Sequence, residues 1–390
     1  MTAVEQAVGG VSFALSDEQK ELRALAREFA AKEIRPRAAE YDVAMQHPAD
    51  VIELAHELGL MNLHIPPAYG GPGLGAFDGM LVGEELNWGC TGIGTSLGAN
   101  GLGAGPVLIA GTDEQKAAWL PPLVESPLLC SFGLSEPEAG SDVARLKTTA
   151  TPHGGDYVLN GSKTFISNAG YAAWTVVFAK TDPSKGHRGI SAFIVPMDAP
   201  GVTIEKHLDK MGQRATDTSA FALQDVVVPA ANRLGGEGDG FKLAMQTLDF
   251  TRPGTAIGAV GVAQAAYELS VEYAKQRVTF DVPIAMHQGV SFLIADMATE
   301  IEAARLLTWQ AAWLLDQGER ATLHSSFAKR FAADTAMKVT TDAVQIFGGY
   351  GYMKEYPVEK LMRDAKLFQI YEGTSQIQRL VIAKEIFLPR

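Results

Sequence analysis

The segment Asp156-Tyr157-Val158-Leu159-Asn160-Gly161-Ser162-Lys163-Thr164-Phe165-Ile166-Ser167 decides the fold, because it interrupts a chain whose pattern on both sides is helical. Its composition and period are those of strands. At its centre, Asn160-Gly161 is typical of a type I′ turn, which requires positive φ angles at both positions. The segment is therefore predicted to be a β-hairpin, with Phe165 and Ser167 on one face of its second strand.

Three further runs rich in β-branched or aromatic residues surround this segment, at residues 174–179, 190–195 and 221–228. Pro196 and Pro229 close the last two runs. Short strands at this spacing predict an antiparallel β domain of roughly 100 residues, placed at residues 131–238.

The sequence before the strands is helical in period. Ser16 is a candidate N-cap, and Gln19 three residues later completes a capping box. Leu22 and Phe29 belong to one apolar face of the helix that follows, which we expect to end at Arg35-Pro36. Residues 1–130 are therefore predicted to form an all-α domain.

Long helices return after the strands. From Val290 the apolar face of one segment continues without Gly or Pro until Gly318. Such helices favour an up-and-down four-helix bundle over residues 239–390. The predicted fold class is α+β, with the β domain between two helical domains.

Composition bounds the function. The 390 residues predict two or three domains, and a net charge of −12 argues against binding to a nucleic-acid backbone. Two cysteines, Cys90 and Cys130, do not make a disulfide framework. No long apolar run predicts a membrane span, and residues 1–6 lack the character of a leader. We expect a cytoplasmic protein of bacterial type, or a mitochondrial matrix protein if the chain is processed.

General motif searches give mostly negative results. A Walker A loop is excluded because the chain has no Gly-Lys pair, and His56-Glu57 lacks the second histidine of a zinc site, so we expect no metal. Residues 94–98 (GTSLG) match the GxSxG nucleophile elbow, with Ser96 as the nucleophile. No strand precedes them, so close packing or room for a ligand is favoured over a serine hydrolase.

Four segments resemble the acyl-CoA dehydrogenase family, in its order and spacing. They are residues 134–142 (LSEPEAGSD), Thr251-Arg252-Pro253, residues 345–351 (QIFGGYG) and residues 355–379. The resemblance extends over residues 13–390, and residues 57–62 (ELGLMN) are most similar to the medium-chain members. The helix–sheet–helix order predicted above is also that of the family.

The resemblance implies FAD and the α,β-dehydrogenation of a fatty acyl-CoA to its trans-2-enoyl-CoA, as in fatty-acid β-oxidation. Glu372 occupies the position of the family's base, which removes the α-proton while a hydride leaves the β-carbon for flavin N5. Its backbone N–H is an oxyanion donor, and Gly373 leaves room for the thioester. Some branches keep the base at the position of Thr251, which cannot act as one.

The resemblance also implies two sets of binding residues. The FAD set is Phe132, Leu134, Ser135, Ser141, Phe165, Ser167, Arg277, Thr279, Phe280, His287, Gln288, Gln345, Gly348, Gly349, Thr374 and Gln376. The substrate set is Ser141, Asp249, Arg252, Tyr371, Gly373, Gly94 and Gly98. In the family the residues at Gln345, Gly348 and Gly349 come from a neighbouring subunit, which implies a homotetramer, and electron-transferring flavoprotein takes up the electrons.

Three residues depart from the family pattern. Glu138 stands where glycine is usual, Phe165 where tryptophan is frequent, and Asp281 where glycine is usual. An acidic side chain is unfavourable if it faces a diphosphate, so Asp281 bears on the local geometry of the adenine site.

Gly94 and Gly98 suggest a substrate length. In medium-chain members, Gln and Glu close the bottom of the acyl pocket at these positions. Two glycines should deepen the pocket, and each further buried CH₂ adds at most about 0.8 kcal/mol. We expect medium-to-long straight acyl groups, unless neighbouring side chains refill the space. An acyl-CoA oxidase that uses O₂ and a non-catalytic acyl-CoA-binding flavoprotein remain the alternatives.

Overall fold

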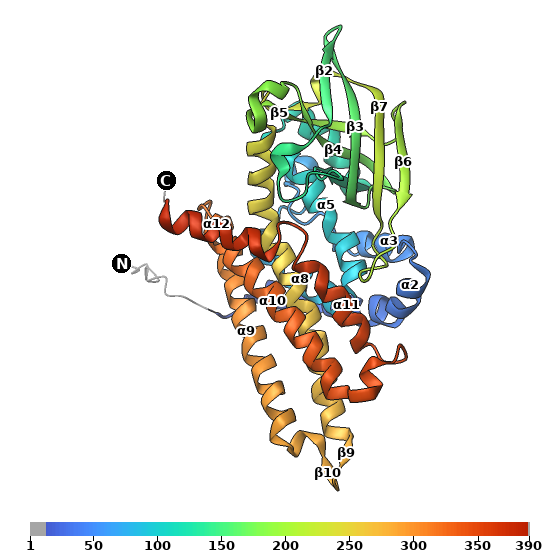
Figure 1. The fold of residues 1–390 in the computed structure, drawn as a ribbon, viewed down its shortest axis with the longest axis vertical. Coiled ribbons are helices and arrows are strands. Elements are labelled where there is room, and N and C mark those ends of the chain that lie inside the picture. Colours follow the sequence, from blue (N-terminus) through green and yellow to red (C-terminus); the bar gives the residue numbers. More distant parts are fainter. Residues whose placement is uncertain (1–12, 389–390) are drawn as a thin grey trace, which may run out of the picture.

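The protein is described here by a computed structural model of residues 13–388, in which helices, then a sheet, then helices follow along the chain (Figure 1). Residues 1–6, on which the expectation about a leader depends, lie outside the described range. The predicted fold class is confirmed, whereas the domain limits near residues 130 and 238 stay predictions.

The N-terminal helices begin as the sequence indicates. The Ser16 side chain accepts a hydrogen bond from the Gln19 backbone N–H at 3.1 Å, and the Gln19 side chain accepts one from the Ser16 backbone N–H at 3.1 Å. Together these two bonds form the expected capping box. The α-helix ends at Phe29, but helical turns continue through Pro36. The helices are α1 (Asp17–Phe29), α2 (Ala38–Ala44), α3 (Ala49–Glu57), α4 (Ala76–Gly89), α5 (Thr91–Ala110), α6 (Asp113–Trp119) and α7 (Pro121–Glu125).

The sheet lies at one end of the molecule, beside α5 (Figure 1). Its strands are β1 (Leu129–Gly133), β2 (Thr149–His153), β3 (Asp156–Ser167), β4 (Ala172–Lys180), β5 (Ile190–Pro196), β6 (Val202–His207), β7 (Thr218–Val228) and β8 (Arg233–Leu234). Their order is β6-β7-β3-β2-β4-β5-β8, and β1 pairs with β4. Because β1 and β4 run parallel, the sheet is mixed and the expectation of a purely antiparallel domain is wrong.

The predicted hairpin at Asn160-Gly161 is also wrong, because β3 is one strand from Asp156 to Ser167. The turn lies earlier, at Gly154-Gly155 between β2 and β3. Gly161 is needed for close packing instead: a Cβ there would lie 2.4 Å from the Thr148 hydroxyl. The pairing of β3 with β7 shifts at this point, so the positive φ belongs to a bulge.

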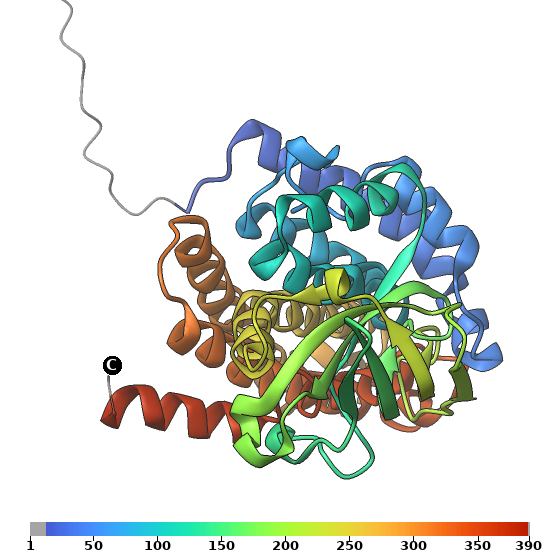
Figure 2. The same cartoon turned by 90° about the horizontal axis from the view of Figure 1, so that it is seen from above.

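The C-terminal helices are α8 (Gly240–Gln276), α9 (Gln288–Asp316), α10 (Thr322–Phe347), α11 (Val358–Phe368) and α12 (Ser375–Phe387). The first three run side by side along the long axis of the molecule (Figure 1). The short strands β9 (Val278–Thr279) and β10 (Val282–Pro283) form a tip at the end opposite the sheet. Seen from above, α12 extends outward from the rest of the chain (Figure 2).

Apolar side chains of the N-terminal helices and the bundle form one core. Phe29, Leu86 and Ile93 share it with Ile257 and Met297, so α8 and α9 pack directly against the first domain. A second core joins the N-terminal helices to β1, β4 and β5. Leu234 on β8 and Leu243 on α8 also belong to this second core, so both ends of the connection between the sheet and the bundle are packed. No helix within residues 13–388 is long and apolar enough to cross a membrane.

Candidate active site

The loop between α11 and α12 carries Glu372 in a conformation that few residues adopt. Glu372 has φ +50° and Gly373 has φ +90°, so both lie in the left-handed region. A left-handed non-glycine residue costs about 1–3 kcal/mol and persists only where surrounding groups hold it. Strain of this kind is concentrated at functional sites, which makes Glu372 a candidate on backbone geometry alone.

Hydroxyl groups on α8 hold the Glu372 carboxylate. Thr251 donates to Glu372 Oε2 at 2.9 Å, and the Thr255 hydroxyl is a second donor one turn later. Burial raises the pKa of Glu372, while these hydroxyls and the positive charges of Arg252 and Lys329 act in the opposite direction. A carboxylate with a raised pKa is a stronger base once it is ionised.

Side chains from two other helices hold the backbone of the same loop. Gln378 on α12 donates to the carbonyl oxygens of Glu372 at 3.2 Å and Gly373 at 3.1 Å. Lys329 on α10 donates to the Gly373 carbonyl at 2.6 Å. Sequence analysis missed Lys329, Thr255 and Gln378. Gln378 lies inside the motif segment 355–379 but was given no role there, and no motif covers Lys329 or Thr255.

Three of the predicted substrate residues, Tyr371, Arg252 and Asp249, lie near Glu372 in the folded chain. Burial raises the pKa of Tyr371, and its hydroxyl accepts from Gln213 Nε2 at 3.4 Å. Arg252 is 4% exposed and forms an ion pair with Asp249, so its guanidinium lies in the interior near Glu372. This burial leaves Arg252 little surface for an external ligand. Its positive charge acts instead on Glu372, where it lowers the pKa of the carboxyl group.

Gly94 and Gly98 both lie within helix α5. A nucleophile elbow requires a turn from a strand into a helix, so residues 94–98 cannot be one. Ser96 is fully buried and donates to the Gly92 carbonyl, as a helical serine does. A Cβ at Gly94 would lie 2.9 Å from the Asn87 side chain, whereas a Cβ at Gly98 would meet no atom within 4 Å. Asn87 therefore fills the space at Gly94, whereas Gly98 is an exposed position of the helix.

The predicted flavin-binding residues of the sheet and its loops differ in how much of their surface is exposed. Phe132 and Leu134 are buried, and the Phe132 ring lies 4.8 Å from that of Phe178. Phe165, at φ +60°, is 68% exposed, so its ring is free to cover a ligand. Ser167 is half-buried at the end of β3, beyond an irregularity in the pairing with β7 between Lys163 and Ile166, so regular alternation does not fix the relative sides of Phe165 and Ser167. Ser135 is half-buried and Ser141 is exposed in the loop after β1.

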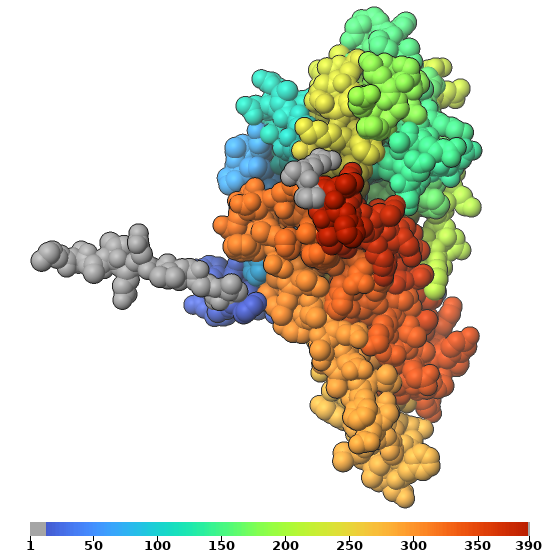
Figure 3. Space-filling model, turned by 60° about the vertical axis from the view of Figure 1, so that its left-hand side comes forward, coloured from blue at the N-terminus to red at the C-terminus, as the bar shows by residue number. Residues whose placement is uncertain are grey.

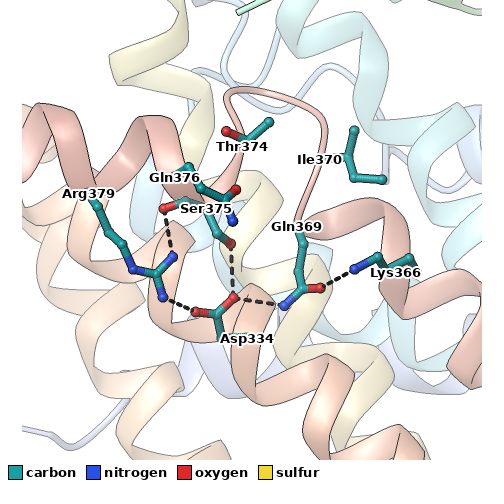
Figure 4. Close-up of a pocket in the computed structure, with 8 residues that line it drawn as sticks. All are labelled: Asp334, Lys366, Gln369, Ile370, Thr374, Ser375, Gln376 and Arg379. Carbon is teal, nitrogen blue, oxygen red and sulfur yellow. Dashed lines mark hydrogen bonds and ion pairs between the residues drawn. The ribbon is translucent and has the colours of Figure 1, made fainter.

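An open pocket of about 410 Å³ is lined in part by Ile370 and Thr374, which flank Glu372 in the chain (Figure 4). Thr374 and Gln376, both predicted to bind FAD, line it. Asp334 at its floor accepts from Gln369 at 2.8 Å and Arg379 at 2.8 Å. The pocket is polar and already ordered by its own hydrogen bonds.

The remaining predicted FAD residues lie at the tip, far from Glu372. The last residue of α8, Gln276, is 25 residues beyond Thr251, which corresponds to about 38 Å of helix. Arg277 and the predicted residues that follow it come after this point: Thr279, Phe280, His287 and Gln288. The guanidinium of Arg277 lies over the Tyr350 ring, which places Gln345, Gly348 and Gly349 at the same end. One chain thus separates its predicted FAD residues into two groups.

Of the three departures from the family pattern, Glu138 has a local explanation. Its carboxylate pairs with Lys147 at 2.5 Å on the surface, away from the buried part of the loop. Asp281 and Phe280 are both left-handed in the turn between β9 and β10.

Comparison with known families matches nearly the whole described chain. Profiles described as the N-terminal, middle and C-terminal domains of acyl-CoA dehydrogenase match residues 16–126, 131–226 and 238–387. A protein of Bacillus subtilis named acyl-CoA dehydrogenase is 46% identical over 371 residues, which is 95% of this chain and 98% of that protein.

Solved structures give the same result. Butyryl-CoA dehydrogenase from Megasphaera elsdenii superposes with a TM-score of 0.94 and is 45% identical, covering 96% of this chain and all of that one. A chain from a study of the electron transferring flavoprotein of Acidaminococcus fermentans superposes with a TM-score of 0.95 and is 44% identical. That match covers 97% of this chain and all of the other.

Proposed function

The chain belongs to the acyl-CoA dehydrogenase family, and from this membership we propose that Glu372 removes the α-proton of a fatty acyl-CoA during its conversion to the trans-2-enoyl-CoA. The protein is an oxidoreductase of that family, and its cofactor is FAD. The observation that carries the proposal is Glu372 itself: its backbone is left-handed, its side chain is half-buried, and its carboxylate is hydrogen-bonded to Thr251.

The residues present fit this cofactor. The backbone at Gly348 and Gly349 is open, with no atom within 4 Å of a Cβ at either position, as close approach of a phosphate requires. Arg277 supplies a cation beside them, and the exposed ring of Phe165 is available to cover a flavin. Bound FAD supplies the acceptor for the hydride that leaves the β-carbon.

The remaining chemistry belongs to this chain. Glu372 takes the proton from the carbon next to the thioester, and enolate-like charge then develops on the thioester oxygen. The Glu372 backbone N–H is proposed as a donor to that oxygen, and a donor of this kind contributes about 3–4 kcal/mol in comparable sites. Burial raises the pKa of Glu372, which makes the ionised carboxylate a stronger base than one in water.

The two groups of FAD residues support a site shared between copies of the chain. An extended FAD cannot span the length of α8 from Thr251 to Arg277, so the tip of one copy would complete the site of another. Phe280 is 90% exposed at this tip, which narrows to a protruding end (Figure 3). We propose a homotetramer built from such pairs.

The acyl group we propose is a medium-to-long straight chain, and the support for it is that glycine stands at positions 94 and 98, where the medium-chain members carry Gln and Glu. Asn87 limits the other direction by filling the space at Gly94 and at Gly258 on α8. Gly258 lies two turns beyond Thr251, so Asn87 would meet the far end of a chain that starts at Glu372.

Electron-transferring flavoprotein is the proposed acceptor, since one structural relative comes from a study of such a protein. The cytoplasm is the proposed location, since a relative comes from Bacillus subtilis. Fatty-acid β-oxidation is the proposed pathway.

Anaerobic bleaching tests the proposal. The purified protein should be yellow, and octanoyl- or palmitoyl-CoA should bleach it without oxygen. The Glu372→Gln variant should keep the yellow colour, but its rate of bleaching should fall by several orders of magnitude, because the amide cannot accept the proton. Bleaching at an undiminished rate in that variant would reject Glu372 as the base, and rapid reoxidation of the wild type by O₂ would favour an oxidase.

A further inference from the structure

We propose that Lys329 is a positioning residue for Glu372: its buried ammonium group holds the Glu372–Gly373 loop in its left-handed conformation and places positive charge beside the carboxylate. This inference depends on the proposed function, because it assigns Lys329 a role only if Glu372 is the base.

Lys329 lies on α10 with none of its surface exposed. Its Nζ donates to the Gly373 carbonyl at 2.6 Å. Within residues 13–388 this ammonium group forms no salt bridge, although it has three N–H donors. Burying an unpaired charge is unfavourable, and a methionine would fill the same volume without it. Among the described residues, the direct partner of this charge is the loop that carries Glu372.

The backbone geometry explains why such a donor is needed. Glu372 and Gly373 are consecutive left-handed residues, and strained backbone persists only where its surroundings hold it. Lys329 from α10 and Gln378 from α12 donate to the Gly373 carbonyl from two different helices. With that carbonyl fixed, the preceding peptide and the Glu372 side chain have a defined direction.

The charge has a second consequence. Burial lowers the pKa of Lys329 to about 8, and Glu372 and Asp334 raise it while Arg252 lowers it. Lys329 and Arg252 both lower the pKa of Glu372, against the effect of burial; Tyr371 is the other titratable neighbour. Removal of the Lys329 charge should therefore raise the pKa of Glu372, and the base would be ionised only at higher pH.

Two variants separate the charge from the hydrogen bond. Lys329→Met removes both, whereas Lys329→Gln keeps a donor but no charge. Lys338→Met is the matched control, since Lys338 lies on the same helix in a partly exposed pair with Glu300. For each variant we would measure kcat and KM with octanoyl-CoA from pH 5 to 9, together with flavin content and Tm.

In Lys329→Met the acid limb of the kcat profile should move up by roughly one pH unit. Its kcat should also fall about tenfold or more with KM little changed, because a displaced base is costly in the transition state. Lys329→Gln should show the shift of the limb with a smaller loss of kcat, and Lys338→Met should match the wild type. If Lys329→Met loses its flavin, the acid limb of the Lys329→Gln profile alone tests whether removal of the charge shifts the pH dependence.

An unshifted acid limb in a flavin-loaded Lys329 variant would overturn the inference. A wild type that no acyl-CoA bleaches would instead overturn the proposed function. The two failures are therefore distinguished by the wild-type measurement. A fall in Tm with an unchanged pH profile would mean that Lys329 is only structural, which also contradicts the proposal.

Discussion

Glu372 combines two features that folded proteins usually avoid, a left-handed backbone and a carboxylate whose pKa is raised by partial burial. Each is unfavourable, and both persist because Thr251, Lys329 and Gln378 supply donors from three helices. The arrangement makes chemical sense for a base that must remove a proton from carbon, since a solvated carboxylate at its ordinary pKa is too weak.

At the same scale, Asn87 should set the length of the acyl group. Asn87→Ala opens space beside Gly94 and Gly258, and removes a side chain whose amide donates only to the Gly83 carbonyl in its own helix. The kcat/KM ratio between longer and shorter acyl-CoA substrates should rise up to about fourfold for each added CH₂, equivalent to about 0.8 kcal/mol. A series from C4 to C16 measures this.

Asn160→Ala on the surface of the sheet is the control, because Asn160 pairs with exposed Asp225 far from α4. The same length profile in Asn87→Ala and wild type would contradict a role for Asn87. A wild-type maximum at C4 would contradict the proposed medium-to-long substrate.

Among the elements, β1 and β3 are joined by a buried ion pair. Lys163 on β3 is fully buried and reaches Glu136 after β1 at 2.7 Å, and it also donates to the Leu134 carbonyl at 3.3 Å. Glu136 accepts in addition from the backbone N–H of Thr148 at 3.0 Å. The pair therefore holds the loop in which Leu134 and Ser135 are predicted to meet the flavin.

Breaking this pair from one side should be costly. Lys163→Met leaves the Glu136 carboxylate buried without its charged partner, which typically destabilises a protein by about 3–5 kcal/mol. Urea unfolding of the variant should show this loss. The double variant Glu136→Gln/Lys163→Met removes both charges and should recover part of it. If the double variant is less stable than Lys163→Met, the loss of stability does not come from the unpaired charge of Glu136.

At the scale of the whole molecule, the separation of the FAD residues predicts complementation between chains. Glu372→Gln and Arg277→Ala should each be inactive alone, one for lack of the base and the other for weak FAD binding. In a mixed dimer, one site would combine intact Glu372 of one copy with intact Arg277 of the other. Random pairing should restore about a quarter of the wild-type activity.

Co-expression of the two variants in equal amounts measures this activity in the unsorted population. Purification on two different tags then isolates the mixed assemblies, whose activity should exceed that quarter. Two copies of Arg277→Ala serve as the control for residual FAD binding. An inactive mixed assembly with full flavin content would place each FAD site within one chain and contradict the shared site.

Sequence by itself determined what depends on near neighbours along the chain. The capping box of α1, the uninterrupted helix α9 and the strands β4, β5 and β7 follow from local chemistry and period, and the family motifs identified Glu372. Only the tertiary structure decided the rest. Asn160-Gly161 continues a strand because Thr148 needs the space of the missing side chain. Thr251 and Lys329 meet Glu372 and Gly373 across 121 and 44 residues, where helix packing, and no spacing rule, brings these groups together.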